Sequence, residues 1–564
     1  MRRTNAVVAS ALVAAVLFPG APARAQVSEA RLRELIRQAA DATKEPTGSG
    51  DPQTAVAAQE QGPIVRLTLD EAVAFALDRN LDIRVQRLNP ELQDIALASA
   101  RAFYSPSLTS AVNRSNTVGT PSSQLQISSG GKGVTQDRLV YNAGLTQNVA
   151  WGGGLLTATL NNNRNVSDSN NALFNPQYNA NWQFVFTQPI LRDFKIDAQR
   201  RTLAVTKINR DVSDIQLRAS MTNLVSNVRN AYWDYVFATL AVEVAGQSLA
   251  LADKLVADNQ TRVEIGTMAP IDVVQAQAEQ ATRRSSLVTA QNTRRTAELT
   301  LKRLIVSGTD DPNWSVTLEP VDRPDFQPDQ VDLEAAIRRA LSERTDVAIA
   351  KKSIENNSTT LGYLRNQALP VVDAQVTYGV QGIGGTQLLR SNSGVLGSSF
   401  TTVPGSIADA FSSLFRSQYP SWTVGLNVTY PIGTSTQGAA VARARVQLSQ
   451  VEAQIKQIEL QVATEITNAA ITLRNTAESV QAAQAARELS LRRLEAEQSK
   501  FEVGMSTNYQ VVQAQRDLND ARNSELRGIL NYQKARVEFE RLQQTTLQNT
   551  NITVIAAGGG AGGA

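Results

Sequence analysis

The sequence contains neither cysteine nor histidine among its 564 residues. Without them the protein has no thiol nucleophile, no disulfide, no imidazole base and none of the usual zinc or haem ligand sets. Most hydrolase and metalloenzyme classes are thereby excluded, although carboxylate or lysine chemistry is still possible. No pocket motif or acid/base constellation appears in the sequence. We therefore expect no enzymatic activity, no cofactor and no bound metal.

The chain also lacks a strong net charge and long apolar runs. Its 55 Lys and Arg residues against 52 Asp and Glu residues give a net charge of +3, spread along the chain. Nucleic-acid-binding proteins concentrate Lys and Arg on one surface, so we expect no nucleic-acid partner. Beyond the N-terminus no apolar run approaches 18 residues, and we therefore expect no membrane-spanning helix.

The N-terminus has the pattern of an export signal. Arg2 and Arg3 precede the apolar run AVVASALVAAVLF, and a Pro-Gly pair and the small-residue site ARA follow it. An N-terminal membrane anchor is the alternative, but 13 apolar residues are too few to span a bilayer. The sequence predicts a signal peptide at 1–25, removed before Gln26. Residues 26–62 then read as an N-terminal extension with a Pro/Gly/Ser linker.

The rest of the chain is a duplication. LDEAVAFALDRNLDIRV at 69–85 aligns with LEAAIRRALSERTDVAI at 333–349, and RVEIGTMAPIDVVQAQ at 262–277 returns as KFEVGMSTNYQVVQAQ at 500–515. Internal repeats have to be identified before single helices and strands, because the repeats define the architecture. We expect a first repeat over 63–311, an inter-repeat linker over 312–332, a second repeat over 333–547 and a disordered Gly-rich tail over 548–564.

Each repeat reads as helix, β segment, long helix, glycine turn and helix. The β segments cover 107–190 and 371–432, and the turns lie near 266 and 504. Proline-free stretches from Thr202 to Glu264 and from Ala439 to Glu502 predict helices of roughly 90 to 100 Å. Four helices of about half that length, at 69–103, 270–305, 333–368 and 508–546, would match them when stacked in pairs. For the apolar seam alone, a generic coiled-coil rod is the better interpretation, but it does not account for the β segments.

The β segments alternate between apolar and small polar residues, as in NWQFVFTQPI and SWTVGLNVTYPI. Strands of this kind are typical of transmembrane β-barrels, whose apolar face contacts lipid. A soluble sandwich has the same period, but the export signal and the Asn/Ser/Gly-rich loops favour a barrel. The predicted lipid-facing residues are Trp182, Phe184, Phe186, Trp422, Val424, Leu426, Val428 and Tyr430.

The number of strands requires more than one chain. Each half supplies two strong strands, and a further candidate hairpin lies near 139–163. Four to six strands are too few to close a barrel around a lumen, and open edges do not occur in lipid. The sequence therefore predicts an oligomer, in which three copies of a four-strand sheet would give twelve strands.

The duplicated plan, the W…PI strand ends and the two GxxxxxxVVQAQ hairpins together resemble the TolC-like outer-membrane efflux proteins, from Leu67 to about Leu547. The resemblance implies a mixed α and β membrane protein. A homotrimer would form a twelve-strand barrel in the outer membrane lipid and a helical barrel across the periplasm of a Gram-negative-type envelope. It also implies an exit duct for tripartite efflux or type I secretion, working with a periplasmic adaptor (membrane fusion protein) and an inner-membrane pump.

The same resemblance assigns roles at the helix turns. EIGT and EVGM would be the periplasmic tip turns on which the adaptor docks, through Ile265, Gly266, Thr267, Val503, Gly504 and Met505. Well-known family members carry acidic residues just past the second turn. Here Gln510 and Gln513 stand at those places, while the first half keeps Asp272. These three residues are expected to line the aperture, with amide hydrogen bonds and one carboxylate ring.

A different class of function is compatible with much of this pattern. A structural periplasmic coiled-coil spacer or an adhesin without transport activity would also be exported and rich in long helices. Outer-membrane location and conductance would separate the two. The sequence of the duct does not indicate which substrate is transported, because the inner-membrane pump mainly determines substrate selectivity.

Overall fold

The computed structural model describes residues 63–120, 133–169, 172–324, 326–328, 330–390, 400–430, 432–433 and 435–549. The chain divides into Met1–Pro63 and Ile64–Ala564, and every helix and strand below lies in the second unit. The predicted signal peptide, the 26–62 extension and residues 550–564 fall outside the described residues. Residues 548 and 549 were expected in the tail but end the short helix α13 (Thr546–Asn549), because the neighbouring Leu547 is buried in the apolar core.

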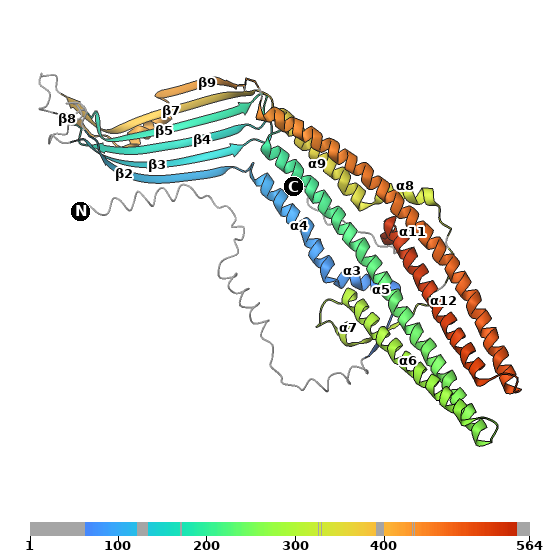
Figure 1. The fold of residues 1–564 in the computed structure, drawn as a ribbon. Coiled ribbons are helices and arrows are strands. Elements are labelled where there is room, and N and C mark those ends of the chain that lie inside the picture. Colours follow the sequence, from blue (N-terminus) through green and yellow to red (C-terminus); the bar gives the residue numbers. More distant parts are fainter. Residues whose placement is uncertain are drawn as a thin grey trace, which may run out of the picture. The chain divides into compact units, whose positions relative to one another are not determined.

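Two helices of equal length organise this unit. α5 (Ala198–Glu264) and α11 (Thr436–Glu502) each have 67 residues, which corresponds to about 100 Å. Past a turn, α6 (Pro270–Ile305) runs back along α5, and α12 (Asn508–Leu542) runs back along α11. α4 (Leu81–Ala102) and α9 (Thr345–Gln367) pack beside the other halves of α5 and α11 (Figure 1). Two shorter helices thus lie beside each long one, in both halves of the chain.

The first helix of each half is broken where one continuous helix was expected. α3 (Leu69–Arg79) ends at Asn80, and α8 (Leu333–Glu343) ends at Arg344, both with extended backbone. The Asn80 side chain accepts hydrogen bonds from the backbone N–H groups of Asp82 and Ile83, which starts α4. Its amide also donates to the Leu304 carbonyl at 3.0 Å. The prediction of one continuous helix is therefore wrong in each half. A capping residue such as Asn80 looks in the sequence like an ordinary polar residue of a helix.

A compact core forms around α5, mainly from residues of the first half and of the inter-repeat linker. β1 (Ile64–Leu67) pairs in parallel with β6 (Thr317–Pro320), after the short helix α7 (Pro312–Ser315). Tyr232 and Tyr235 of α5 are buried there, and their hydroxyls donate to the carbonyls of Leu67 and Leu318. Burial raises the pKa of both tyrosines well above its ordinary value.

After the N-terminus the sequence has no unbroken apolar run that approaches 18 residues, but one helix passes a test of length and mean hydropathy. One 18-residue window of α5 reaches a mean hydropathy of 1.4, which is enough by length and composition alone. Core helices pass the same test. Only 22% of this window is buried in the structure, and length and composition alone do not show a membrane span.

The remaining strands form one antiparallel sheet. Its order is β2 (Ser107–Val118), β3 (Thr135–Asn148), β4 (Leu155–Ser167), β5 (Phe174–Pro189), β7 (Val371–Arg390) and β9 (Tyr419–Thr429). The short strand β8 (Phe400–Val403) pairs with the far end of β7, and helix α10 (Ile407–Phe415) follows it.

This order corrects the four-strand count used above. The candidate hairpin near 139–163 is β3–β4, and it lies inside the sheet, between β2 and β5. β2 itself was not recognised as a strand because only three of its residues, Leu108, Val112 and Val118, are large and apolar. The long strands that one chain supplies to the sheet therefore number six among the described residues.

Candidate channel wall and helical tip

The sheet has one apolar face and one polar face. Directly paired residues share a face, and the register places Trp182 opposite Val380, Phe184 opposite Tyr378, and Val376 opposite Val424. The Trp182 and Tyr378 rings meet edge to face, with centroids 5.9 Å apart. The predicted lipid-facing residues within β5 and β9 lie on this apolar face, together with Leu145, Leu156, Leu160 and Ala374. Tyr430 follows the end of β9 and is not paired in the sheet.

The opposite face carries mainly amides and hydroxyls. Its rows include Asn161, Asn163 and Asn165 on β4, Asn179, Asn181 and Gln183 on β5, and Gln375, Thr377, Thr423 and Asn427 on β7 and β9. Ionisable groups are sparse on it and include Arg138 and Asp373. A sheet with one apolar and one polar face can form the wall of a barrel that separates lipid hydrocarbon from water.

The wall has two unpaired edges within one chain. Among the described strands, β2 is bonded to β3 and β9 to β7, so that each has one free side. The side chains of Trp422 and Val424 on β9 are 75% and 67% exposed. Backbone N–H and C=O groups along both edges are available for pairing, and such groups are costly to leave open in lipid.

Helix α10 lies on the apolar face near the sheet end remote from the long helices. Its buried residues Ala410 and Leu414 pack against Ala180 and Val380. Gly382 permits this contact, because a Cβ there would lie 2.0 Å from the Ala410 carbonyl oxygen. α10 was not predicted from the sequence, although the capping box formed by Ser406 and Asp409 marks its start.

At the opposite end of the unit, the two glycine turns have the same geometry. Gly266 and Gly504 both have φ of +77°, a region that favours glycine. In the first turn the N–H of Thr267 donates to the Arg262 carbonyl at 2.9 Å and that of Gly266 to Val263 at 3.0 Å. These are the two bonds of a Schellman motif, which ends a helix and reverses the chain.

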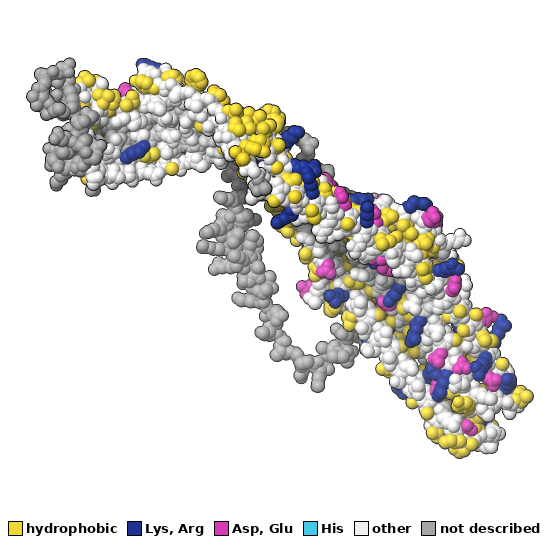
Figure 2. Space-filling view, turned by 45° about the horizontal axis from the view of Figure 1, so that its top comes forward, with side chains coloured by type: hydrophobic (Ala, Val, Ile, Leu, Met, Phe, Trp, Pro, Cys, Tyr) yellow, Lys and Arg dark blue, Asp and Glu magenta, His cyan; other side chains and the backbone are white. Residues whose placement is uncertain are grey.

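The second turn repeats this pattern. The N–H of Met505 donates to the Lys500 carbonyl at 2.8 Å, and that of Gly504 donates to Phe501 at 3.2 Å. Together the turns present exposed apolar side chains at the end of the helices, visible as yellow patches at the lower end in Figure 2: Ile265, Ile271, Val274, Val503, Met505 and Tyr509. Contiguous exposed apolar groups mark interaction surfaces.

Direct contacts tie the two turns to each other. The guanidinium of Arg262 lies 4.5 Å from the ring centre of Phe501. Just above them, the fully buried Asn259 donates to the Asn508 side-chain oxygen at 3.1 Å. Asn508 in turn donates to the backbone carbonyl of Asp272 at 3.4 Å. The two helix hairpins are therefore joined by a cation–π contact and by amide hydrogen bonds.

The residues expected to line an aperture are engaged locally. Gln510 closes the capping box of α12, where its side-chain oxygen accepts from the Thr507 N–H at 3.3 Å. Gln513 donates to Asp517 at 2.9 Å. Asp272 lies half-buried in the first turn of α6. An aperture needs several chains, so the ring of these three residues stays a proposal.

One carboxylate links the hairpins further from the turns. Glu279 of α6 is 3% exposed. It accepts hydrogen bonds from Arg283 on its own helix at 2.7 Å and from Arg516 on α12 at 2.5 Å. Burial raises the pKa of Glu279, but the bonds from Arg516 and Arg283 outweigh this and hold the pKa below its ordinary value. Nothing in the sequence pairing of the repeats signalled this link.

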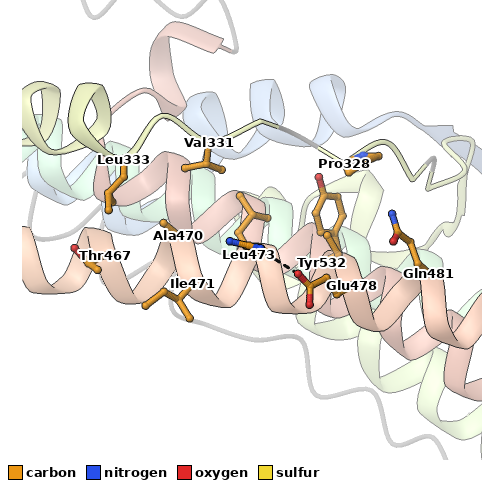
Figure 3. Close-up of a pocket in the computed structure, with 12 residues that line it drawn as sticks. Pro328, Val331, Leu333, Thr467, Ala470, Ile471, Leu473, Glu478, Gln481 and Tyr532 are labelled. Atoms are coloured by element: carbon orange, nitrogen blue, oxygen red, sulfur yellow. Dashed lines mark hydrogen bonds and ion pairs between the residues drawn. The ribbon is translucent and has the colours of Figure 1, made fainter.

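A groove of about 370 Å³ lies where the inter-repeat linker crosses α11. Pro328 and Val331 of the linker face Leu473 and Ile471, and the Tyr532 hydroxyl donates to the Gln327 carbonyl at 2.8 Å (Figure 3). The groove contains no acid/base constellation. Within the described residues no group of His, Cys, Asp and Glu side chains is arranged to hold a metal.

Comparison with known proteins gives one family. The family model described as outer membrane efflux protein matches residues 155–306 and 336–543, which is more than half of the chain. No curated protein matches the sequence.

Solved structures agree in fold. A membrane protein from Pseudomonas aeruginosa matches with 16% identity and a TM-score of 0.60, covering 89% of this chain and 96% of that one. The Campylobacter jejuni CmeC outer membrane channel matches with 14% identity and a TM-score of 0.58, covering 90% and 93%. The open-state MtrE outer membrane channel of Neisseria gonorrhoeae matches with 16% identity and a TM-score of 0.56, covering 84% and 88%.

Proposed function

This chain belongs to the outer membrane efflux protein family and is an outer-membrane exit duct, and from that membership we propose that three copies build the duct together. The observation that supports the trimer is the two-faced sheet with open edges on β2 and β9. A lipid-facing sheet has to close, and identical chains close most simply by cyclic symmetry. In the trimer the predicted lipid-facing residues contact lipid, and the amide-rich face lines the lumen.

The long helices continue the wall on the periplasmic side. α5 and α11, with the shorter helices beside them, would form a twelve-helix tube from three chains. The two turns centred on Gly266 and Gly504 lie at its far end, and their exposed apolar residues are the surface that a periplasmic adaptor would contact. An inner-membrane efflux or secretion pump would then deliver substrate through the adaptor into the tube. Asp272, Gln510 and Gln513 would line the aperture.

Reconstitution tests this proposal against the spacer or adhesin alternative. The mature chain, purified from outer membranes in detergent, is expected to have the native mass of a trimer and to conduct ions in a planar bilayer. A stable monomer or dimer would contradict the assembly. Trimers without any conductance would favour the spacer.

The adaptor contact needs a separate measurement. Ile265, Val503 and Met505 are each at least 68% exposed and make no part of the apolar core. Replacing all three with serine should leave the trimer and its conductance unchanged, but abolish efflux by the complete pump. Unchanged efflux would place the adaptor elsewhere on the helices.

A further inference from the structure

The β3–β4 hairpin has the dimensions of a membrane-spanning wall element. β3 has 14 residues and β4 has 13, and the other four long strands have between 11 and 20. A tilted strand needs about 9 to 11 residues to cross the hydrocarbon. All six strands are therefore long enough to span, whereas β8 has 4 residues and is not.

Hydrogen-bond ladders hold the hairpin in the sheet on both sides. β3 pairs with β2 from Ser107 opposite Thr146 to Val118 opposite Thr135. β4 pairs with β5 along nearly its whole length, from Leu155 opposite Thr187 onward. A hairpin bound along both flanks cannot fold away from the wall without breaking both ladders.

The tight turn between β3 and β4 is fixed at the helical end of the sheet. Gly152 and Gly153 both have φ of +69°, and the Gln188 amide of β5 donates to the Gly152 carbonyl at 2.8 Å. The Trp151 ring contacts Phe194, which precedes α5, with centroids 5.9 Å apart. The hairpin thus begins and ends at the same level as its neighbours.

The side chains of the hairpin continue both faces of the sheet. Ala143 and Leu145 of β3 lie opposite Leu160 and Ala158 of β4, on the apolar face. Asn161 of β4 lies opposite Asn181 of β5, on the polar face. A segment folded into the lumen would be wet on both sides and would not need this alternation.

We propose that β3–β4 is part of the barrel wall, so that the trimer has eighteen strands rather than the twelve implied by the family resemblance. This inference rests on the trimer of the proposed function. The partner at each open edge is a second copy of this chain, with β9 of one protomer beside β2 of the next.

The extra strands set the width of the duct. With a strand spacing of about 4.8 Å and a tilt of about 40°, eighteen strands give a backbone diameter of about 36 Å, against about 24 Å for twelve. Twelve helices at about 9 to 10 Å spacing make a tube of about 34 to 38 Å. An eighteen-strand barrel would continue this tube with little change in width.

A wider barrel changes which solutes can leave. The cross-section would be about twice that of a twelve-strand barrel, since it scales with the square of the strand number. The residues that the hairpin adds to the lumen are mainly uncharged, with Thr157, Thr159, Asn161 and Asn163 in one row, and they include the charged Arg138 of β3. The duct would suit bulky hydrated solutes, and the barrel would not limit their size.

Electron cryo-microscopy of the full-length protein in nanodiscs tests the strand number directly. The expected result is a trimer with eighteen strands and a barrel about 36 Å across. A trimer with twelve strands, and with β3–β4 outside the ring, would overturn this inference and leave the exit duct intact. A particle that is not a trimer would overturn the proposed assembly as well.

Single cysteines give a second measurement, because the chain has no native cysteine. Ala143→Cys on the apolar face should react with a lipid-soluble maleimide and resist a charged one. Asn161→Cys on the polar face should show the opposite preference. Ala374→Cys and Gln375→Cys on β7 are the matched pair in a strand of the second half. Equal reaction of both hairpin cysteines with the charged reagent, while the β7 pair discriminates, would place the hairpin outside the wall.

Discussion

At the scale of single residues, Gly504 is required for its backbone conformation and not for lack of space. A Cβ at Gly504 would have no atom within 4 Å, so only its φ of +77° opposes substitution. Gly504→Val should cost about 1 kcal/mol or more. That cost is small for a trimer with long helical seams. Trimer abundance in the outer membrane should therefore be kept, while efflux by the complete pump should fall because the turn is displaced.

Gly504→Asn is the control, because asparagine tolerates this backbone region better than other residues. It should retain most efflux. Gly266→Val should behave like Gly504→Val, since the two turns have the same φ and hydrogen bonds. Loss of the trimer in the valine variants would make these glycines purely structural.

Two neighbouring residues of β9 test the assignment of faces. Leu426 lies on the apolar face opposite Ala374, and Asn427 lies on the polar face opposite Asp373. Leu426→Lys should lose roughly 2 to 4 kcal/mol if it lies near the bilayer midplane. Asn427→Lys should be milder because it would face water. Thermal stability of the trimer in lipid measures both, and equal losses would mean that the faces are not lipid and lumen.

At the scale of elements, Glu279 couples α6 to α12, and this coupling should depend on pH. The pKa of Glu279 is held below its ordinary value in the folded protein. Its contribution to stability is therefore present above the unfolded pKa of about 4.3 and is lost as pH falls through the folded value. Hydrogen-exchange protection factors at 262–283 and 500–516, which correct for the intrinsic exchange rate at each pH, should fall on acidification over that window.

Glu279→Gln should remove this acid dependence and leave exchange fast at neutral pH, because Arg283 and Arg516 lose their shared carboxylate. Glu488→Gln is the matched control. Its partner Arg492 is on the same helix, and both side chains are largely exposed, so the substitution should change little. An acid dependence that persists in Glu279→Gln would assign it to other carboxylates.

Helix α10 depends on a glycine of the strand beneath it. Gly382→Val would drive a side chain into the Ala410 carbonyl, whereas Gly425→Val on β9 has open space around its Cβ. Gly382→Val should therefore detach α10 and leave the sheet in place. Ala410→Cys is buried in the native packing and should react with maleimide when combined with Gly382→Val, but not with Gly425→Val.

At the scale of the whole molecule, closure joins β9 of one chain to β2 of another. The structure of a single chain does not give the register between β9 and the β2 of the next chain, so several cysteine pairs are tested. Thr423→Cys on β9 is combined in turn with cysteine at the polar-face positions Thr109, Ala111 and Asn113 of β2. At least one pair should give a covalent trimer on a denaturing gel. The control pair of Thr423→Cys with Asn163→Cys, from inside the sheet, should give none. Trimers from the control alone would contradict closure through β2.

The sequence by itself determined the repeats, the two long helices and their glycine turns. It also determined the apolar face of β5, β7 and β9. These features follow from local patterns, because a period of two or of three to four residues and a glycine between helices act within a few positions. The family followed from their combination.

Tertiary structure decided what depends on partners distant in the chain. Asn80 interrupts a helical pattern because its amide meets the Leu304 carbonyl, 224 residues away. β2 is a strand because β3 offers it a ladder, although its own alternation is weak. The place of the β3–β4 hairpin between β2 and β5, and the link from Glu279 to Arg516, arise for the same reason. Local periodicity does not predict which distant segments pair, because the energy of that pairing comes from contacts that only the folded chain makes.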